Sequence, residues 1–582
     1  MIPIKPAKTF EGRCKQLVDH FSSREASEFL GFKDLIEVAA RLYANRNVDE
    51  AMDDLREILR KPRGDMFWMV PITLVAYVGR GRFPDDIARR MTELWRLYTP
   101  YRGDTENHWA MYYCVLYLLA QLHPDQDGSF WFNGRSSDEN RKEATEYLDS
   151  WIELTLSKGQ GEFDSPHYIN FYVSPLALLY AFCEDPDMKR KAGLMLDLIL
   201  ADFAADSLNG LFVGAFSRIY PEPLMHRWKN GSTTLAWLAF GNVPFRPDAI
   251  GLVVPTIGYR PHGVAFILAI SGWKPAPQLV QAATDRTHPY LHRELKRTRF
   301  RIRYSEERSI PVYKTTYMTK DFALGSIQGG LIQPIQQHSW ELFWAEDDVY
   351  TGHNLLFTIH PFAGELELGM YFPEEPKLLT EAVIRGEKPT YDLPGKWTGA
   401  SPHEQIFQHF NTLIALYDIP SGTHYSHISG YFSRRLRQVE EDPSGWIFAR
   451  AGRAFVAYYP LAPFEWREEG DGDRRLHSDV LKNGAVVHVA QEADYATYTD
   501  FRSAVRRRDL EVSLEPVPSV KWTTPTGDVI ECAYGVAPSV NGEEVDFSEW
   551  PLFEGPFVRG EAGTGKVEVG RPGDAVVLEF AG

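Results

Sequence analysis

Three short stretches in the first half of the chain combine side chains that move protons with side chains that bind an anion. The first opens with Glu106-Asn107-His108-Trp109, the second runs from Gly159 to Tyr172, and the third runs from Ser217 to Trp228. Carboxylates, imidazoles and phenols serve as general acids and bases, while amide and guanidinium donors stabilise negative charge. The three stretches therefore predict a site for acid–base chemistry.

Each stretch also admits a simpler interpretation. Asn107 has the right type to be a plain N-cap. In the second stretch, Asp164 or Ser165 could cap a helix that has Pro166 at its first position. The capping interpretation leaves several polar residues unexplained, and these become the candidate site residues of the helical half: Asn107, His108, Glu162, His167, Tyr168, Tyr172, Arg218, Tyr220, His226 and Trp228.

The elements that must position these residues are predicted to be helices up to about residue 290. Large apolar residues recur three and four apart at residues 34–46, 50–60, 87–98, 107–122, 147–155, 172–183 and 188–205. Short connections rich in Gly, Pro and Asp separate them, which is typical of antiparallel helical hairpins. No sequence repeat of fixed period is present, which favours a bundle or a closed toroid over an open solenoid. In a toroid, the ends of consecutive hairpins converge on one rim.

Near residue 295 the apolar period changes from 3.6 to 2, which predicts strands to the end of the chain. Turn signals such as Gly329-Gly330 and Asn541-Gly542 favour antiparallel sheets in a sandwich. The predicted strands cover residues 300–304, 321–327, 338–344, 355–360, 412–419, 446–449, 454–459, 486–489 and 576–580. His338 leads into one of them and could face the helical half across a cleft.

The fold class predicted is therefore α+β and multidomain: an N-terminal (α/α) toroid, or incomplete helical barrel, followed by antiparallel β-sandwich domains. We expect a helical domain at residues 1–290 and a central β-sandwich at 291–465. A segment dense in charge and glycine, residues 467–475, suggests a seam before a C-terminal β-sheet domain at 466–582.

The amino-acid composition limits the classes of protein to which the chain can belong. Of the 582 residues, 44% are apolar and 24% are charged, which is typical of a globular protein and excludes disorder. The formal charge of −17 opposes nonspecific binding to nucleic acid or anionic lipid. We expect no nucleic-acid or membrane partner, because no run of about 18 apolar residues exists. A polyanionic ligand would need a locally basic groove, for which residues 296–303 and 506–508 are the candidates.

The positions of the histidines and cysteines indicate whether the chain binds a metal and which cellular compartment suits it. The four cysteines are widely separated and form no CxxC pair, so no zinc knuckle or disulfide framework is expected. His288 and His292 lie four apart without an HExxH context, and no phosphate-binding or nucleophile-elbow motif is present. We predict no metal and no organic cofactor. Without an apolar leader at the N-terminus, a cytoplasmic location is the expectation; the oligomeric state stays open.

The arrangement resembles the polysaccharide lyases built from a helical toroid and antiparallel sheets, which include alginate, chondroitin and heparinase II/III-like lyases. In that family an Asn-His pair on one helix is followed some 50–60 residues later by a Tyr. Here the pair is Asn107-His108, and Tyr168 follows His108 by 60 residues. Glu106 and Trp109 flank the pair, unlike the usual family pattern.

The resemblance implies β-elimination on a uronic-acid-containing glycan, giving a 4,5-unsaturated uronate. Asn107 and His108 would neutralise the uronate carboxylate, and Tyr168 or Tyr172 would remove the proton. A tyrosine has an unperturbed pKa of ~10, so a cation such as Arg218 would have to lower it. Further substrate contacts would come from Glu162, His167, Tyr172, Tyr220, His226, Trp228 and His338. A cytoplasmic location would favour acidic oligosaccharides over polymers.

Two alternatives belong to other classes. The first is a glycoside hydrolase on an (α/α) barrel, with Glu162 or Asp164 as acid and Glu106 or another carboxylate as base. The second is a non-catalytic carbohydrate-binding or scaffold protein, for which Asn107, His108 and Tyr168 should lie apart from one another.

Overall fold

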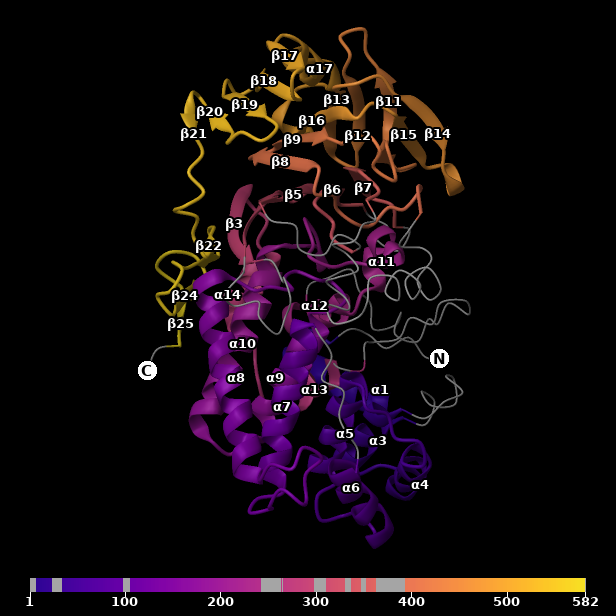
Figure 1. Ribbon diagram of the computed structural model, residues 1–582, viewed down its shortest axis with the longest axis vertical. Helices are drawn as coiled ribbons and strands as arrows, with labels where there is room; N and C mark the ends of the chain where they lie inside the picture. The colour runs from indigo at the N-terminus through magenta and orange to yellow at the C-terminus, as the bar shows by residue number, and fades with distance from the viewer. Residues whose placement is uncertain are drawn as a thin grey trace.

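The computed structural model describes residues 7–23, 34–97, 105–241, 263, 265–297, 310–329, 336–346, 352–362 and 393–580. Its N-terminal half is helical and its C-terminal half consists of antiparallel sheets, stacked along the long axis of the molecule (Figure 1). The predicted fold class is confirmed. None of the described helices has the length and apolar content needed to cross a membrane.

Six of the described helices form the inner ring of the toroid. Each packs against the next, and the ring closes where the last packs against the first. In ring order they are α1 (Phe10–Ser22), α3 (Leu35–Ala44), α5 (Met66–Val78), α7 (Glu106–Leu122), α9 (Asn170–Phe182) and α13 (Ala265–Ile270). Helices α5 and α9 are apolar nearly all round, as expected of helices covered on every side.

A second set of helices lies outside the ring, each packed on an inner helix or on an outer neighbour. They are α4 (Val48–Ile58), α6 (Asp85–Leu97), α8 (Ser137–Lys158), α10 (Pro186–Ala205) and α14 (Pro277–Thr284). Their starts follow standard capping chemistry: Ser136 and Glu139 form a capping box on α8, and Asp185 caps α10 ahead of Pro186. These are the inner and outer layers of an (α/α) toroid.

The end of the toroid beneath the sheets carries short elements. A two-stranded hairpin of β1 (Ser207–Leu208) and β2 (Leu211–Phe212) follows α10, and then come α11 (Pro221–Met225), a 3₁₀ turn (Arg227–Lys229) and α12 (Gly231–Phe240). Phe216 forms an isolated antiparallel bridge with His338, so the helical half and the β half are joined by backbone hydrogen bonds.

Two sheets form the sandwich above the toroid, and β5 packs on β8 between them. The nine-stranded sheet has the order β14 (Glu465–Glu468), β15 (Arg474–Ser478), β10 (Ile428–Phe432), β7 (Leu355–Ile359), β6 (Trp340–Trp344), β5 (Phe322–Gly329), β4 (Pro311–Met318), β3 (Tyr290–Arg297), β22 (Phe553–Glu554). The six-stranded sheet has the order β11 (Arg437–Glu441), β12 (Ile447–Ala451), β13 (Ala454–Pro460), β16 (Lys482–Gln491), β9 (Thr412–Asp418), β8 (Glu404–His409).

The C-terminal segment covers the sandwich and then returns to the toroid. Helix α17 (Tyr498–Arg506) precedes a five-stranded sheet of β17 (Leu510–Ser513), β18 (Ser519–Thr523), β19 (Val529–Ala533), β20 (Ser539–Val540) and β21 (Glu543–Glu544). The chain then runs down the side of the molecule, where β22 joins β3 (Figure 1). A last sheet of β23 (Val558–Arg559), β24 (Lys566–Val569) and β25 (Val576–Glu579) packs on α10 and α14.

Two local predictions need comment. The first strand of the β half is β3, which begins at Tyr290, ahead of the predicted change at residue 295; the predicted strand at residues 300–304 lies outside the described part. The division into domains at 290 and 465 stays a prediction. Residue 466 lies within β14, which pairs with β15 in the same sheet as β3–β7.

Candidate functional site

Glu162 is the centre of a buried polar cluster at the upper rim of the toroid. It lies in the loop between α8 and α9 and is 2% exposed. Its Oε2 accepts hydrogen bonds from the Asn107 backbone N–H (3.1 Å) and from Asn107 Nδ2 (2.6 Å), while its Oε1 accepts one from Arg218 Nη1 (2.7 Å). The Tyr172 hydroxyl donates to the same Oε2 at 3.3 Å. All three sequence stretches therefore meet at one carboxylate.

A second buried carboxylate, Glu106, adjoins the first. Its Oε2 accepts from the Glu162 backbone N–H (2.6 Å), and its Oε1 accepts from Trp151 Nε1 (2.9 Å) and Arg297 Nη2 (2.7 Å). The Tyr172 hydroxyl bridges the two carboxylates, at 3.4 Å from Glu106 Oε2. Two guanidinium groups and several amide donors thus neutralise two adjacent negative charges.

Local structure at these two stretches differs from the capping predictions. Thr105, and not Asn107, is the N-cap of α7, so the Asn107 amide is available for Glu162. Helix α9 begins at Asn170, after a turn at residues 166–169, and not at Pro166. Ser165 Oγ accepts from the Tyr168 backbone N–H at 3.2 Å, which fixes that turn and places Tyr168 at its end.

Tyr168 lies between a cation and a second phenol. The Arg218 guanidinium covers its ring, with Cζ 3.9 Å from the ring centroid, and the Tyr168 and Tyr220 hydroxyls are hydrogen-bonded to each other. Tyr168 is 4% exposed, whereas Tyr220 is half-buried. Gln336, which precedes β6, accepts from Arg218 Nε at 2.5 Å. The β half therefore takes part in positioning Arg218.

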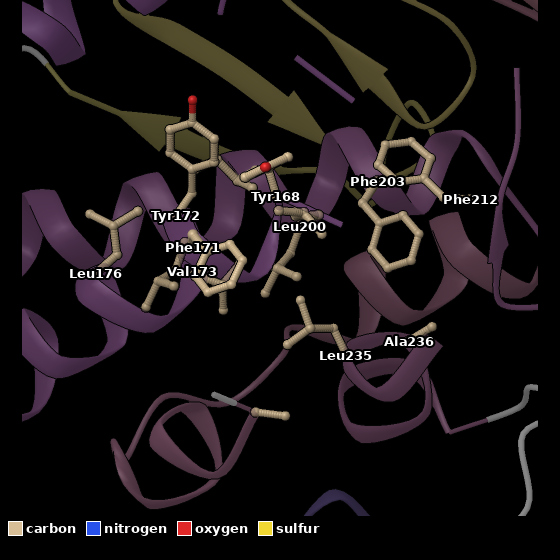
Figure 2. Close-up of a cluster of buried hydrophobic side chains, with 14 of the residues drawn as sticks. Tyr168, Phe171, Tyr172, Val173, Leu176, Leu200, Phe203, Phe212, Leu235 and Ala236 are labelled. Carbon is tan, nitrogen blue, oxygen red and sulfur yellow. The ribbon is translucent and has the colours of Figure 1, made fainter. Parts of the chain in front are cut away.

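Tyr168 and Tyr172 occupy different environments at the edge of one apolar cluster (Figure 2). Both rings pack against apolar side chains of α9 and α10, while the Tyr172 hydroxyl points away from that cluster. That hydroxyl meets Glu106 and Glu162, and nearby negative charge disfavours a phenolate. The Tyr168 ring faces Arg218 instead, and positive charge favours a phenolate.

His167 contacts the Tyr168 ring directly, and His108 is connected to it through a row of aromatic rings. His167 contacts the rings of Tyr168 (5.0 Å between centroids) and Tyr220 (5.4 Å). Burial, with a smaller contribution from Arg218, lowers the pKa of His167 to about 4, so its imidazole is neutral near pH 7. Phe67, which is 39% exposed, contacts the ring of His108 at 5.0 Å, and Phe171 contacts both Phe67 and His167.

Asp164 belongs to a neighbouring ionic cluster that fixes β3 and β4 onto the toroid. It lies 2.6 Å from Lys314 Nζ and 3.4 Å from Lys296 Nζ. Both lysines also contact Glu294, while Asp202 pairs with Lys296 and Asp206 with Lys314. Burial raises the pKa of Asp206 to about 6, despite the opposing charge of Lys314.

The other three candidates lie in separate contacts. His338 is 2% exposed, stacks on Phe216, and has its Nε2 3.1 Å from Glu341 Oε2, which also pairs with Arg227. The His226 ring lies 5.0 Å from that of His353, whose Nδ1 is 2.8 Å from Asp473. Trp228 lies under Lys229 Nζ, 5.5 Å from the ring.

Sequence reasoning missed several groups of the site. In the sequence, Arg297 is only one member of the basic run at 296–303, and Gln336 is only one member of a polar run before a strand. Nothing in the sequence pairs Arg297 with Glu106, or Gln336 with Arg218, because both contacts span more than 100 residues. Phe67 is exposed on α5, and nothing in that apolar segment of the sequence distinguishes it from its buried neighbours.

Comparison with known proteins gives distant similarity only. No family model matches the chain, and no curated protein sequence matches it. Among solved structures, the chain is similar to a heparinase III with methylated lysines, at 10% identity and a TM-score of 0.32, over 88% of this chain and 75% of that one. A second heparinase III structure is similar at 10% identity and a TM-score of 0.34, over 90% and 81% of the two chains.

Proposed function

We propose that the chain cleaves uronic-acid-containing oligosaccharides or polysaccharides by β-elimination. The observation that carries the proposal is the placement of Tyr168, with its ring under the Arg218 guanidinium and its hydroxyl bonded to Tyr220. Positive charge over the ring favours the phenolate, which is the form that can act as a base. Tyr220, being half-buried, connects this phenol to the outside of the cluster.

In the proposed reaction the Tyr168 phenolate removes the proton from C5 of the uronate. The electron pair forms the C4–C5 double bond as the bond from C4 to the glycosidic oxygen breaks. The departing oxygen then takes a proton from the Tyr168–Tyr220 pair, and the product is a 4,5-unsaturated uronate. Charge that develops on the substrate carboxylate is stabilised by donors at the rim, for which His108 and His167 are the half-buried candidates.

Asn107 and Arg218 take positioning roles in this proposal. Asn107 is fully buried and both its backbone N–H and Nδ2 bind Glu162, so it acts through that carboxylate. Glu162 in turn fixes the guanidinium of Arg218 over Tyr168. Tyr172 is the weaker candidate for the base because its hydroxyl faces two carboxylates.

The two alternatives have less support. A hydrolase would need one carboxyl group to donate a proton, but Glu162 accepts from Asn107 and Arg218, and Asp164 lies between two lysines. A non-catalytic scaffold predicts that Asn107, His108 and Tyr168 lie apart. Asn107 and Tyr168 are instead linked through Glu162 and Arg218, while His108 contacts Phe67.

The deciding experiment measures the ultraviolet absorbance of the conjugated alkene on incubation with a panel of uronate-containing oligosaccharides and polymers. An increase that Tyr168→Phe abolishes supports β-elimination with Tyr168 as base. New reducing ends without that absorbance would overturn the proposal in favour of hydrolysis. Absence of both products across the panel would favour the non-catalytic alternative.

A further inference from the structure

A cavity lies beside the polar segment before β6, next to the residue that binds Arg218. It has a volume of about 590 Å³, which is within the usual range for small-molecule sites. Gln336 binds Arg218, whereas the next residue, Gln337, lines this cavity. Its walls come from β4 and β5, from the edge strand β8, and from residues 534–538 with Phe547 of the C-terminal segment.

The cavity is a built feature and not a gap between loosely packed sheets. Gln405 of β8 fixes the covering loop: its Nε2 donates to the carbonyls of Ala533 (3.2 Å) and Val536 (2.9 Å), and its Oε1 accepts from the Gly535 N–H (2.7 Å). On the opposite wall the ring of Tyr313 packs against Phe547, with centroids 4.8 Å apart.

Two acceptors, Gln328 and Glu404, line the cavity with no cation among its described lining residues. Gln328 lines it, is 5% exposed, and its Oε1 has no hydrogen-bond partner among the described residues. Glu404 also lines it and accepts a hydrogen bond from Ser339 Oγ. No lysine, arginine or histidine occurs among the described residues that line the cavity.

We propose that this cavity binds a small molecule that carries a protonated amine on a body about the size of a sugar ring. Glu404 is the counter-ion of the amine, and Gln328 Oε1 accepts a hydrogen bond from a donor on the ligand. The rings of Tyr313, Tyr534 and Phe547 pack against the ligand body, where aromatic faces attract cations. The absence of basic side chains from the described lining disfavours an acidic glycan, so the site is distinct from the proposed elimination site and does not depend on it.

The protonation of Glu404 agrees with this assignment. Burial raises the pKa of Glu404 to about 7, with the Ser339 hydrogen bond opposing the shift. Near pH 7 about half of the carboxyl groups therefore carry a proton, and a bound ammonium group would displace it. Amine binding should release up to about half a proton per ligand at that pH.

Calorimetric titration of the whole chain at pH 7 tests the proposal with four probes: glucosamine, cyclohexylamine, glucose and N-acetylglucosamine. We expect the two amines to bind at least about tenfold more tightly than the two neutral sugars, because a desolvated charge pair forms only with the amines. Tighter binding of glucosamine than of cyclohexylamine would identify an amino sugar as the ligand class, and the reverse order would identify a non-sugar amine. Equal binding of amines and neutral sugars, or no binding of any probe, would overturn the proposal.

A variant that removes the charge of Glu404 provides a second test of amine binding. Glu404→Gln keeps an oxygen for Ser339, so its thermal midpoint should stay close to that of the unmodified chain while amine affinity falls at least about tenfold. Titrating cyclohexylamine in buffers of different ionisation enthalpy should show proton release that is lost in this variant. The matched control is Glu543→Gln, the same change on the exposed strand β21, which should leave binding unchanged. Undiminished amine binding by Glu404→Gln would overturn the proposal.

Discussion

The guanidinium of Arg218 lies 3.9 Å from the centre of the Tyr168 ring and at the same time donates to Glu162 at 2.7 Å. One cation thus contacts two partners: it donates a hydrogen bond to a carboxylate, and it covers a phenol ring. Asn107 holds that carboxylate through Nδ2, on its other oxygen. The helix that starts at Glu106, the loop before α9 and the segment before α11 are joined by this one arrangement.

Exchange of Tyr168 and Tyr172 for phenylalanine separates the two candidates for the base. Tyr168→Phe should lower kcat by about 10²- to 10⁴-fold, the usual contribution of a general acid–base group. Tyr172→Phe removes only a bridge between two carboxylates and should retain most of kcat. Initial rates of alkene formation on one substrate, with circular dichroism as the folding control, check this. A larger loss in Tyr172→Phe would assign the base to Tyr172.

Glu162→Gln tests whether the position of Arg218 over Tyr168 depends on the charge of Glu162. The amide keeps one oxygen acceptor for the Arg218 Nη1 hydrogen bond but leaves the buried guanidinium without a counter-ion on this side. Breaking such a pair costs about 3–5 kcal/mol in stability, so the thermal midpoint should fall together with kcat. Arg218→Lys is the companion variant, because an ammonium group cannot cover the ring and bind Glu162 and Gln336 together. Unchanged kcat in both variants would contradict the positioning role.

The helical and strand segments could be predicted because their apolar periods are local. Residues 107–122 were predicted as helical and form α7 at Glu106–Leu122, and residues 454–459 were predicted as a strand and form β13 at Ala454–Pro460. The start of α9 was missed because Pro166 and Ser165 give a valid start signal for a turn that precedes the helix. Local chemistry fixes the turn, and tertiary packing decides where the helix begins.

The candidate site could be predicted only as a set of residues. Asn107, Glu162, Tyr168 and Arg218 stand out by their types and do meet, but their bonding could not be inferred from spacing. Asn107 was expected to face a substrate carboxylate, and the structure instead bonds it to Glu162. Contacts across 50 or more residues depend on how the helical hairpins pack, which no local pattern encodes.

His167 should stay neutral well below the usual pKa of a histidine. Burial and Arg218 lower its pKa to about 4, so the imidazole stays neutral as the pH falls from 7 to 5. We expect the NMR shifts of the His167 ring to change near pH 4, whereas an unperturbed histidine would titrate near 6.5. The spectrum of His167→Gln lacks this resonance and so assigns it, and a midpoint near 6.5 would contradict the prediction.

Glu341 and Arg227 join the β half to the toroid. Burial opposes ionisation of Glu341, but Arg227 and His338 outweigh it and lower the pKa. Arg227 Nη2 lies 2.7 Å from Glu341 Oε2, and both side chains are almost fully buried. Glu341→Ala should destabilise the chain by about 3–5 kcal/mol because a buried guanidinium loses its partner. Replacing both residues, Arg227→Met with Glu341→Leu, should restore much of the loss, and thermal unfolding of the two variants and the unmodified chain measures this. A loss below about 1 kcal/mol in Glu341→Ala, the range of exposed pairs, would contradict it.

Asp197 on α10 should make stability fall as the pH rises. Burial raises its pKa from 3.8 to about 6, and the hydrogen bond from Trp273 Nε1 (2.9 Å) only partly offsets this effect. The folded chain therefore binds this proton more tightly than the unfolded chain, so the stabilisation is present below about pH 4 and is lost as the pH rises to 6. Asp197→Asn keeps an oxygen for Trp273 and carries no charge.

The Asp197→Asn variant should thus match the unmodified chain at pH 4 and exceed its stability at pH 7.5 by about 1–2 kcal/mol. A tenfold difference in proton affinity between the folded and unfolded chain corresponds to about 1.4 kcal/mol, and solvent screening reduces the effect. Urea midpoints at four pH values between 4 and 7.5 measure the difference. Glu153→Gln on the exposed face of α8 is the control and should show no such trend, because that carboxylate is exposed. A difference between Asp197→Asn and the unmodified chain that is constant with pH would mean that the gain comes from packing and not from the buried charge.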